Sequence, residues 1–208
     1  MSFRKNILRK IFYFAKKIEI MVENNQVTIE LLQQQIDKLQ KKVQKMENGR
    51  KDQLSIACVS GDLDKILATM IISIAAAAMD TKVKIFFSFW SLSALRDPKK
   101  HPKGKDFISK MFGFMLPKGR NKLKLSKLNM CGMGPVMIKK LMHKNNVLSL
   151  DEMFKTAGEL GIEFIVCEMS MGLMGFKKEE IIDYPHLTFA GATTFVADAC
   201  ESAAQLFV

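Results

Sequence analysis

Short apolar runs separated by polar and glycine-containing segments predict an α/β fold for residues 50–208. Two runs of β-branched and aromatic residues, Leu54–Ser60 and Val83–Trp90, enclose a longer and almost wholly apolar segment, Lys65–Met79. Short runs of this kind are typical of buried parallel strands, whereas the longer segment is typical of a buried helix. The pattern therefore predicts a strand–helix–strand unit with a right-handed crossover, in which the helix is buried on most sides.

The alternation of strands and helices continues to the end of the chain. Strands are expected at Ile162–Val166, Leu187–Ala190 and Leu206–Val208, and helices at Val136–Lys144, Leu150–Leu160, Lys178–Asp183 and Ala192–Ala204. Cys167 stands where the strand pattern of Ile162–Val166 stops, and the residues after it, rich in methionine and glycine, are expected to form a loop.

A different pattern precedes Asn48-Gly49, where apolar residues keep heptad spacing. The two sets of positions are Ala15, Val22, Ile29, Ile36 and Val43, and Ile18, Asn25, Leu32, Leu39 and Met46. This narrow seam, with β-branched residues in the first set and leucines in the second, favours a parallel two-stranded coiled coil. An amphipathic helix lying on its own domain is the alternative. We therefore expect residues 1–49 to be a separate coiled-coil arm and residues 50–208 to be the α/β domain.

Net charge narrows the range of partners. The chain carries 32 Lys and Arg against 21 Asp and Glu, a net charge of +11. This excess of positive charge favours nucleic acid, an anionic membrane or an acidic protein as partner. The alternative is that the lysines only form solvated faces of the protein. No helix-turn-helix, zinc-finger or ribonucleoprotein motif is present, so nucleic acid is not expected.

Two basic segments are candidates for these contacts. Residues 2–20 combine basic pairs with apolar residues, which is typical of a membrane-surface helix or of the first turns of the heptad helix. Arg96–Lys127 contains 11 Lys or Arg, two Asp and the apolar island Phe107–Pro117. This insertion, at about residues 96–128, predicts a lid, a membrane-touching flap, a docking face for an acidic partner, or a mobile segment packed on a neighbouring subunit.

Hydropathy and cysteine spacing bound the cellular setting. The longest apolar stretch, Ile66–Met79, has 14 residues, fewer than the roughly 20 that cross a bilayer. The cysteines at 58, 131, 167 and 200 form no C-x-x-C pair, and the histidines show no zinc-ligand spacing. We expect reduced thiols in a cytoplasmic protein, with peripheral membrane contact as an alternative, and neither a metal nor a cofactor.

Two cysteines stand where chemistry is expected. Cys167 lies at the carboxyl end of a strand, where open α/β sheets place their ligands. Cys131 lies just ahead of a helix, where backbone N–H groups and the helix dipole favour a thiolate. Cys58 and Cys200 are expected in the core, and packing is also the ordinary alternative for Cys167, because free cysteines are among the most buried residues.

Several unusual motifs occur in order along the chain. They are SGDLDK (Ser60–Lys65), FFSFWSL (Phe86–Leu92), KMFGFMLPKG (Lys110–Gly119), KLSKLNMCGMG (Lys124–Gly134), CEMSMGLMGFKKEEIID (Cys167–Asp183) and the closing ATTFVADACESAAQLFV. Together they resemble the DsrE/DsrF-like sulfur-relay family, and within it the branch with a methionine-rich insertion. The resemblance covers roughly Leu54–Val208.

The resemblance implies a three-layer α/β/α fold with a mainly parallel sheet, a flavodoxin-like variant that forms homo-oligomers. It also implies that Cys167, the cysteine before the M-S-M motif, carries persulfide sulfur received from donor proteins and passed to acceptor proteins. Cys131 is the candidate second thiol. The expected supporting residues are Met169, Ser170, Met171, Gly172, Met133 and Gly134, with the methionines as a soft apolar wall. The alternative function is a non-catalytic oligomeric scaffold or membrane-surface module that uses the coiled coil and the basic loop.

Overall fold

The computed structural model describes residues 32–44, 51–102 and 107–208. The chain divides into two units, residues 1–49 and 50–208, and each is described by itself.

In the first unit, residues 32–44 form a helix. Its apolar side chains are all about half exposed or more: Leu32 52 %, Ile36 52 %, Leu39 60 % and Val43 53 %. They recur at heptad spacing, so they share one face of the helix. The coiled coil itself stays a prediction. The rest of the expected seam, including Asn25, and the basic segment 2–20 lie outside the described residues.

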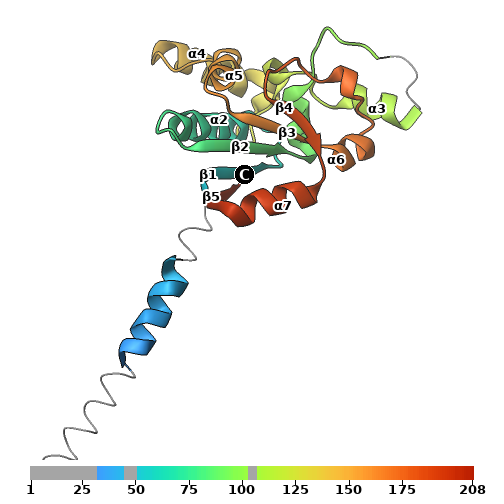
Figure 1. The fold of residues 1–208 in the computed structure, drawn as a ribbon. Helices are drawn as coiled ribbons and strands as arrows, with labels where there is room; N and C mark the ends of the chain where they lie inside the picture. The colour runs from blue at the N-terminus through green and yellow to red at the C-terminus, as the bar shows by residue number, and fades with distance from the viewer. Residues whose placement is uncertain (1–31, 45–50, 103–106) are drawn as a thin grey trace, which may run out of the picture. The chain divides into compact units, whose positions relative to one another are not determined.

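The second unit is built on a sheet of five parallel strands in the order β4-β3-β2-β1-β5 (Figure 1). The strands are β1 (Lys51–Cys58), β2 (Lys82–Phe87), β3 (Glu163–Cys167), β4 (Leu187–Ala190) and β5 (Ser202–Phe207). The expected α/β class with a parallel sheet is therefore confirmed. Because all five strands run the same way, their carboxyl ends meet at one edge of the sheet.

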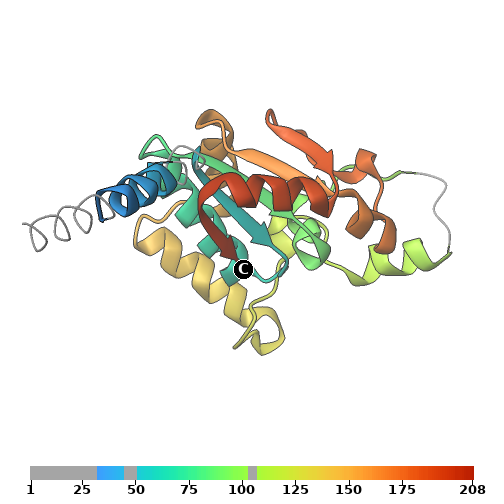
Figure 2. The ribbon, with the colours of Figure 1, turned by 60° about the horizontal axis from the view of Figure 1, so that its bottom comes forward.

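Helices cover both faces of the sheet, which gives the expected three layers (Figures 1 and 2). On one face lie α2 (Leu63–Ala77), α4 (Met133–Lys144) and α5 (Leu150–Glu159), and the other face is covered by α7 (Ala192–Glu201). The larger hydrophobic cluster fills the first side, where Leu63, Ile66 and Met70 of α2 are buried. A smaller cluster fills the α7 side.

Helix boundaries follow local chemistry. The helix α5 begins with a capping box in which the Ser149 hydroxyl and the Glu152 carboxylate each bind the other residue's backbone N–H. It ends before Gly161, whose φ of +71° is the left-handed conformation that glycine adopts without strain. The helix α2 departs from expectation, because its outward residues Ile71 and Ile72 are 49 % and 40 % exposed.

Three expectations around the carboxyl edge are corrected. The strand expected to run to Trp90 ends at Phe87, and the 3₁₀ helix η1 (Phe89–Leu95) follows it. The residues after Cys167 are not a loop but the short helix α6 (Glu168–Leu173). The helix expected at Lys178–Asp183 is a single 3₁₀ turn, η4 (Lys178–Glu180). The chain there is extended instead, because Ile182 N–H donates to the Leu95 carbonyl and Asp97 N–H to the Glu180 carbonyl.

The basic insertion contains a helix, α3 (Phe107–Met115). A buried ion pair anchors it, since Arg96 lies 3.2 Å from Glu180 and also donates to the carbonyl groups of Gly113, Leu116 and Pro117. No helix among the described residues is both long and apolar enough to cross a membrane.

Candidate functional site

Cys167 is the last residue of β3 and the N-cap residue of α6. In the sheet it pairs with Ala190 of the edge strand β4. Its side chain is 1 % exposed and belongs to the smaller cluster with Phe86 and Ile165, against which Phe195 of α7 packs. The thiol thus lies at the carboxyl edge of the sheet, covered on the α7 face.

Two serines continue the site from the sulfur. The Ser170 hydroxyl donates to Cys167 Sγ at 3.3 Å, and the Ser88 and Ser170 hydroxyl oxygens are 2.8 Å apart. A hydroxyl has one proton, so when Ser170 gives its proton to the sulfur, Ser88 donates to Ser170. Ser88 is held in turn by Ser91, whose Oγ accepts from Ser88 N–H at 2.9 Å and donates to the Cys58 carbonyl. The hydroxyl chain Ser88–Ser170–Cys167 therefore points its protons at the sulfur.

This chain changes the acidity of the thiol. Burial raises the pKa of Cys167, but hydrogen bonds from the Ser170 hydroxyl and N–H and from the Met169 N–H, together with the Ser88 hydroxyl that donates to Ser170, bring that pKa below its ordinary value. Hydrogen bonds to the charged form of a group favour that form. Glu168 does not oppose the effect, because its carboxylate is half exposed and bound to Lys178 at 2.6 Å. The site therefore favours a thiolate.

Cys131, the second candidate thiol, lies apart from Cys167. It is exposed in the 3₁₀ turn η3 (Met130–Gly132), ahead of α4 on the opposite face of the sheet from α7 (Figure 1). Its φ is +54°, and Met130 and Leu128 also have positive φ, a strained conformation for residues other than glycine. Both cysteines are free thiols. The structure does not bring them together, and a role for Cys131 stays a prediction.

The expected methionine wall around the sulfur is not formed. Met171 and the neighbouring Met174 pack in the larger cluster, on the other face of the sheet from the Cys167 side chain. Met169 and Met133 are 56 % and 59 % exposed. Met169 and Met171 lie on the helix α6, where side chains point around the whole helix axis, so neighbours in sequence need not share the sulfur's side.

The remaining supporting residues have different positions. Ser170 reaches the sulfur with its side chain, and Met169 contributes through its backbone N–H. Gly172 has open space where a Cβ would stand, whereas a Cβ on Gly134 would lie 2.1 Å from the Leu128 carbonyl oxygen. Ser88 was not predicted as a site residue. It stands 82 positions before Ser170 and only the sheet brings them together, although its place at the end of the strand before Trp90 was a signal.

The other two cysteines, Cys58 and Cys200, differ in burial. Cys58 is fully buried, as expected, and burial raises its pKa to about 11. The prediction for Cys200 is wrong, because this cysteine is exposed on α7. The helix α7 buries only Ala199 fully, so Cys200 lies on its solvent side.

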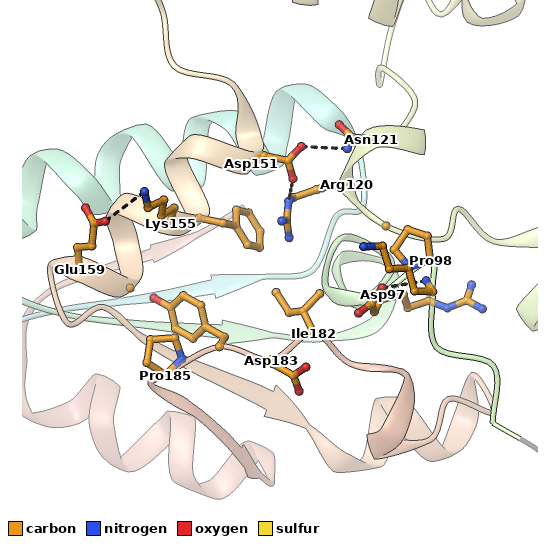
Figure 3. A pocket seen from close by; sticks show the side chains of 16 residues that line it. Asp97, Pro98, Arg120, Asn121, Asp151, Lys155, Glu159, Ile182, Asp183 and Pro185 are labelled. Atoms are coloured by element: carbon orange, nitrogen blue, oxygen red, sulfur yellow. Dashed lines mark hydrogen bonds and ion pairs between the residues drawn. The ribbon is translucent and has the colours of Figure 1, made fainter.

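A separate pocket of about 780 Å³ lies between α5 and residues 182–185 (Figure 3). Two pairs of its charged side chains bind each other: Arg120 binds Asp151, and Lys155 lies 3.8 Å from Glu159. Tyr184 stacks on Phe164 and donates its hydroxyl to the Ile162 carbonyl, so its polar atom is also satisfied. The residues that line the pocket include no cysteine. Within the described residues, no cluster of His, Cys, Asp and Glu could hold a metal ion.

Comparisons with known proteins identify the family of the chain. A sequence model described as the DsrE/DsrF/DrsH-like family matches residues 50–207. The chain is 44 % identical over 154 residues to the uncharacterized protein YrkE of Bacillus subtilis, covering 74 % of this chain and 95 % of that protein. It is 31 % identical over 160 residues to the sulfur carrier protein DsrE2 of Allochromatium vinosum, covering 75 % of this chain and 98 % of that protein. The family expected from the ordered motifs is confirmed: the chain belongs to the DsrE/DsrF/DrsH-like family.

Proposed function

We propose that this protein is a sulfur carrier that accepts sulfane sulfur on Cys167 and passes it to a second protein. The observation that supports this most directly is the hydroxyl chain Ser88–Ser170–Cys167, which favours the thiolate at the carboxyl edge of the sheet. The thiolate is the form of cysteine that attacks persulfides and disulfides. Similarity to a protein named as a sulfur carrier supports the same assignment.

The transfer step is a thiolate displacement. Cys167 Sγ attacks the terminal sulfur of a donor persulfide, a sulfur–sulfur bond forms to Cys167, and the bond between the donor's two sulfurs breaks. The donor leaves as a thiolate, and the sulfane sulfur now bound to Cys167 keeps its proton or releases it to water. No net oxidation occurs, so the step needs no cofactor. The reverse attack, by an acceptor thiolate on the sulfur carried by Cys167, unloads the protein.

Burial of the thiol has a consequence for this mechanism. Cys167 is 1 % exposed, and a side chain of that exposure is shielded from water and from stray thiols. Direct attack of one sulfur on another requires contact. The covering residues, Phe195 of α7 and the six-residue helix α6, therefore have to move before a protein donor reaches the sulfur.

The test is persulfide loading followed by intact-protein mass spectrometry. We expect the full-length chain incubated with a low-molecular-weight persulfide to gain the mass of one sulfur atom, and the Cys167→Ser variant not to gain it. Cys131→Ser and Cys200→Ser are matched controls that remove exposed thiols, and both are expected to load. Loading of Cys167→Ser at the wild-type level would show that another thiol is the carrier. If Cys131→Ser alone loads but fails to unload to an acceptor thiol, Cys131 is the second acceptor.

A further inference from the structure

Six exposed apolar side chains lie at the carboxyl edge of the sheet, on the segments around the thiol. They are Trp90 of η1, Met111, Phe114 and Met115 of α3, and Met169 and Leu173 of α6, and we name them the carboxyl-edge apolar surface. Their exposed fractions range from 44 % for Met111 to 92 % for Phe114. Grouped apolar side chains of this exposure mark interaction sites on proteins, and methionines suit surfaces that bind partners.

The three segments adjoin one another. The helix α6 packs against η1, where the Ser88 and Ser170 hydroxyls also meet. The turn after α6 packs on α3 so closely that a Cβ on Gly175 would lie 2.3 Å from the Ser109 Cβ. A pocket of about 280 Å³ joins Trp90 to Met115. Figures 1 and 2 both show α3 beside α6 at the end of the sheet. The surface is therefore continuous and borders the helix that Cys167 caps.

Positive charge borders the same surface. Lys110 lies one turn before Phe114 on α3, and Lys124 lines the pocket between Trp90 and Met115. Both lysines are exposed, and neither forms an ion pair with a described residue. Among the other cations of the insertion, Arg96 pairs with Glu180 and Lys100 with Asp183, whereas Lys99, Lys122 and Lys127 are exposed. Lys110 and Lys124 together outweigh Asp62, which lines the same pocket as Lys124, so positive charge lies beside the apolar surface.

From this arrangement we infer that the carboxyl-edge apolar surface docks an acidic protein that exchanges sulfur with Cys167. The inference rests on the proposed function, because Cys167 caps the helix α6 of this surface, and an occupant that exchanges sulfur there must itself bring a reactive sulfur. A second copy of this chain has the same lysines, so like charges would face one another across the contact. A lipid surface supplies negative charge but no thiol.

The probe is a short peptide whose single cysteine is activated as a 2-pyridyl disulfide. One version has glutamates and leucines around the cysteine, and a second has lysines in place of the glutamates. The Cys167 thiolate attacks the peptide sulfur, a disulfide joins Cys167 to the peptide, and 2-thiopyridone leaves and is measured by its absorbance. The peptide disulfide is itself the oxidant. The full chain carries Cys131→Ser and Cys200→Ser, which removes the two exposed thiols.

We expect the acidic peptide to react about tenfold faster than the basic peptide at low ionic strength, and salt to reduce the difference. The variant Lys110→Glu/Lys124→Glu is expected to abolish or reverse this preference. The matched control Lys140→Glu/Lys144→Glu changes the same charge at exposed positions on α4, and it is expected to keep the preference. Phe114→Ser is expected to slow the reaction of Cys167 with both peptides but not its reaction with iodoacetamide.

Three outcomes overturn the inference. An equal effect of the control would mean that net charge alone steers the peptide. A Lys110→Glu/Lys124→Glu variant that loses binding to phosphatidylglycerol vesicles but keeps the peptide preference would assign the surface to lipid. Equal reaction rates for the acidic and basic peptides at low salt would show that the surface has no preference for an acidic partner. In each case the proposed function still holds if Cys167 reacts with iodoacetamide and with the persulfide at the normal rate. If Cys167 reacts with neither reagent, both the proposed function and the docking inference are wrong.

Discussion

Two cysteines of this chain end parallel strands, and they differ in the hydrogen bonds they receive. Cys58 ends β1 and Cys167 ends β3, and both are buried. Burial dominates at Cys58, whose hydroxyl partner Thr69 is a distant 3.7 Å from the sulfur, and its pKa is raised to about 11. At Cys167 the hydroxyl and N–H donors outweigh burial, and the pKa is lowered. Position at a strand end is therefore not sufficient to lower the pKa of a thiol. The hydrogen-bond donors around the sulfur determine the direction of the shift.

Removing the Ser170 hydroxyl tests this at the residue scale. A hydrogen bond to a charged group contributes about 1.5–3 kcal/mol. Because the Ser170 hydroxyl favours the thiolate, Ser170→Ala is expected to raise the pKa of Cys167. The measurement is the pH dependence of iodoacetamide alkylation in the Cys131→Ser/Cys200→Ser background, whose midpoint is expected to move to higher pH.

Two further variants separate acidity from packing. Ser170→Thr keeps a hydroxyl and is expected to keep the midpoint of the native chain. Ser88→Ala, one hydroxyl farther along the chain from the sulfur, is expected to raise the midpoint by less than Ser170→Ala. A midpoint that stays the same in Ser170→Ala, with slower alkylation at every pH, would mean that Ser170 only packs against the thiol.

At the scale of elements, local patterns predict well where an element is stabilised by its own residues. The strand Leu187–Ala190 has the predicted bounds, and α5 differs from its prediction at one end only. The errors gather where distant segments meet. The extended chain at Ile182 depends on the Leu95 carbonyl, far away in sequence, so the local helical pattern of residues 178–183 is overridden.

The candidate site shows the same division. Cys167 and Ser170 lie three positions apart, and the sequence predicts both as site residues, whereas Ser88 follows β2 and only the fold brings it to Ser170. Cys200 was misplaced because the pattern of α7 contains small and apolar residues on several sides, and only the contact of Phe195 with Phe86 shows which side is buried. Periodicity gives the spacing of a helix face, and the fold decides which face is covered.

The helix at residues 32–44 presents an apolar seam without a partner among the described residues. In a coiled coil, leucines of the second heptad set pack against each other across the axis. We expect size-exclusion chromatography coupled to light scattering to show that the full-length chain is a dimer. Leu39→Glu is expected to weaken the affinity of the dimer by at least about 100-fold, because truncating a buried leucine alone costs about 2–5 kcal/mol. Gln34→Glu, on the outer side of the same helix, is the control and is expected to leave the dimer intact. A monomeric native chain would contradict the coiled coil.

At the scale of the α/β unit, the two faces of the sheet differ in how they are held. The α2 and α5 face has the larger apolar cluster. Beneath α7, polar groups take part: Gln53 and Ser55 bind Ser202, and Lys84 bridges to Asp198 at 2.5 Å. Cys167 lies in the small apolar part of this second face. Movement of α7 therefore opens only the smaller cluster, whereas movement of α6 also disturbs the larger cluster, to which its Met171 belongs.

The α3 segment, which carries three residues of the carboxyl-edge apolar surface, is held by a buried ion pair, so the stability of the whole unit is expected to depend on Arg96. Arg96 and Glu180 side chains are 3 % and 2 % exposed. Arg96→Met removes a buried charge partner from Glu180 together with the bonds to three carbonyl groups of the α3 segment, and is expected to lower the free energy of unfolding by roughly 3–5 kcal/mol in urea denaturation.

Two further variants are the controls. Arg120→Met breaks the more exposed pair with Asp151 and is expected to lower the free energy of unfolding by at most about 1 kcal/mol. The double variant Arg96→Met/Glu180→Met is expected to recover part of the loss, because no buried charge is left behind. Equal effects of Arg96→Met and Arg120→Met would show that burial of the Arg96 pair does not set its contribution.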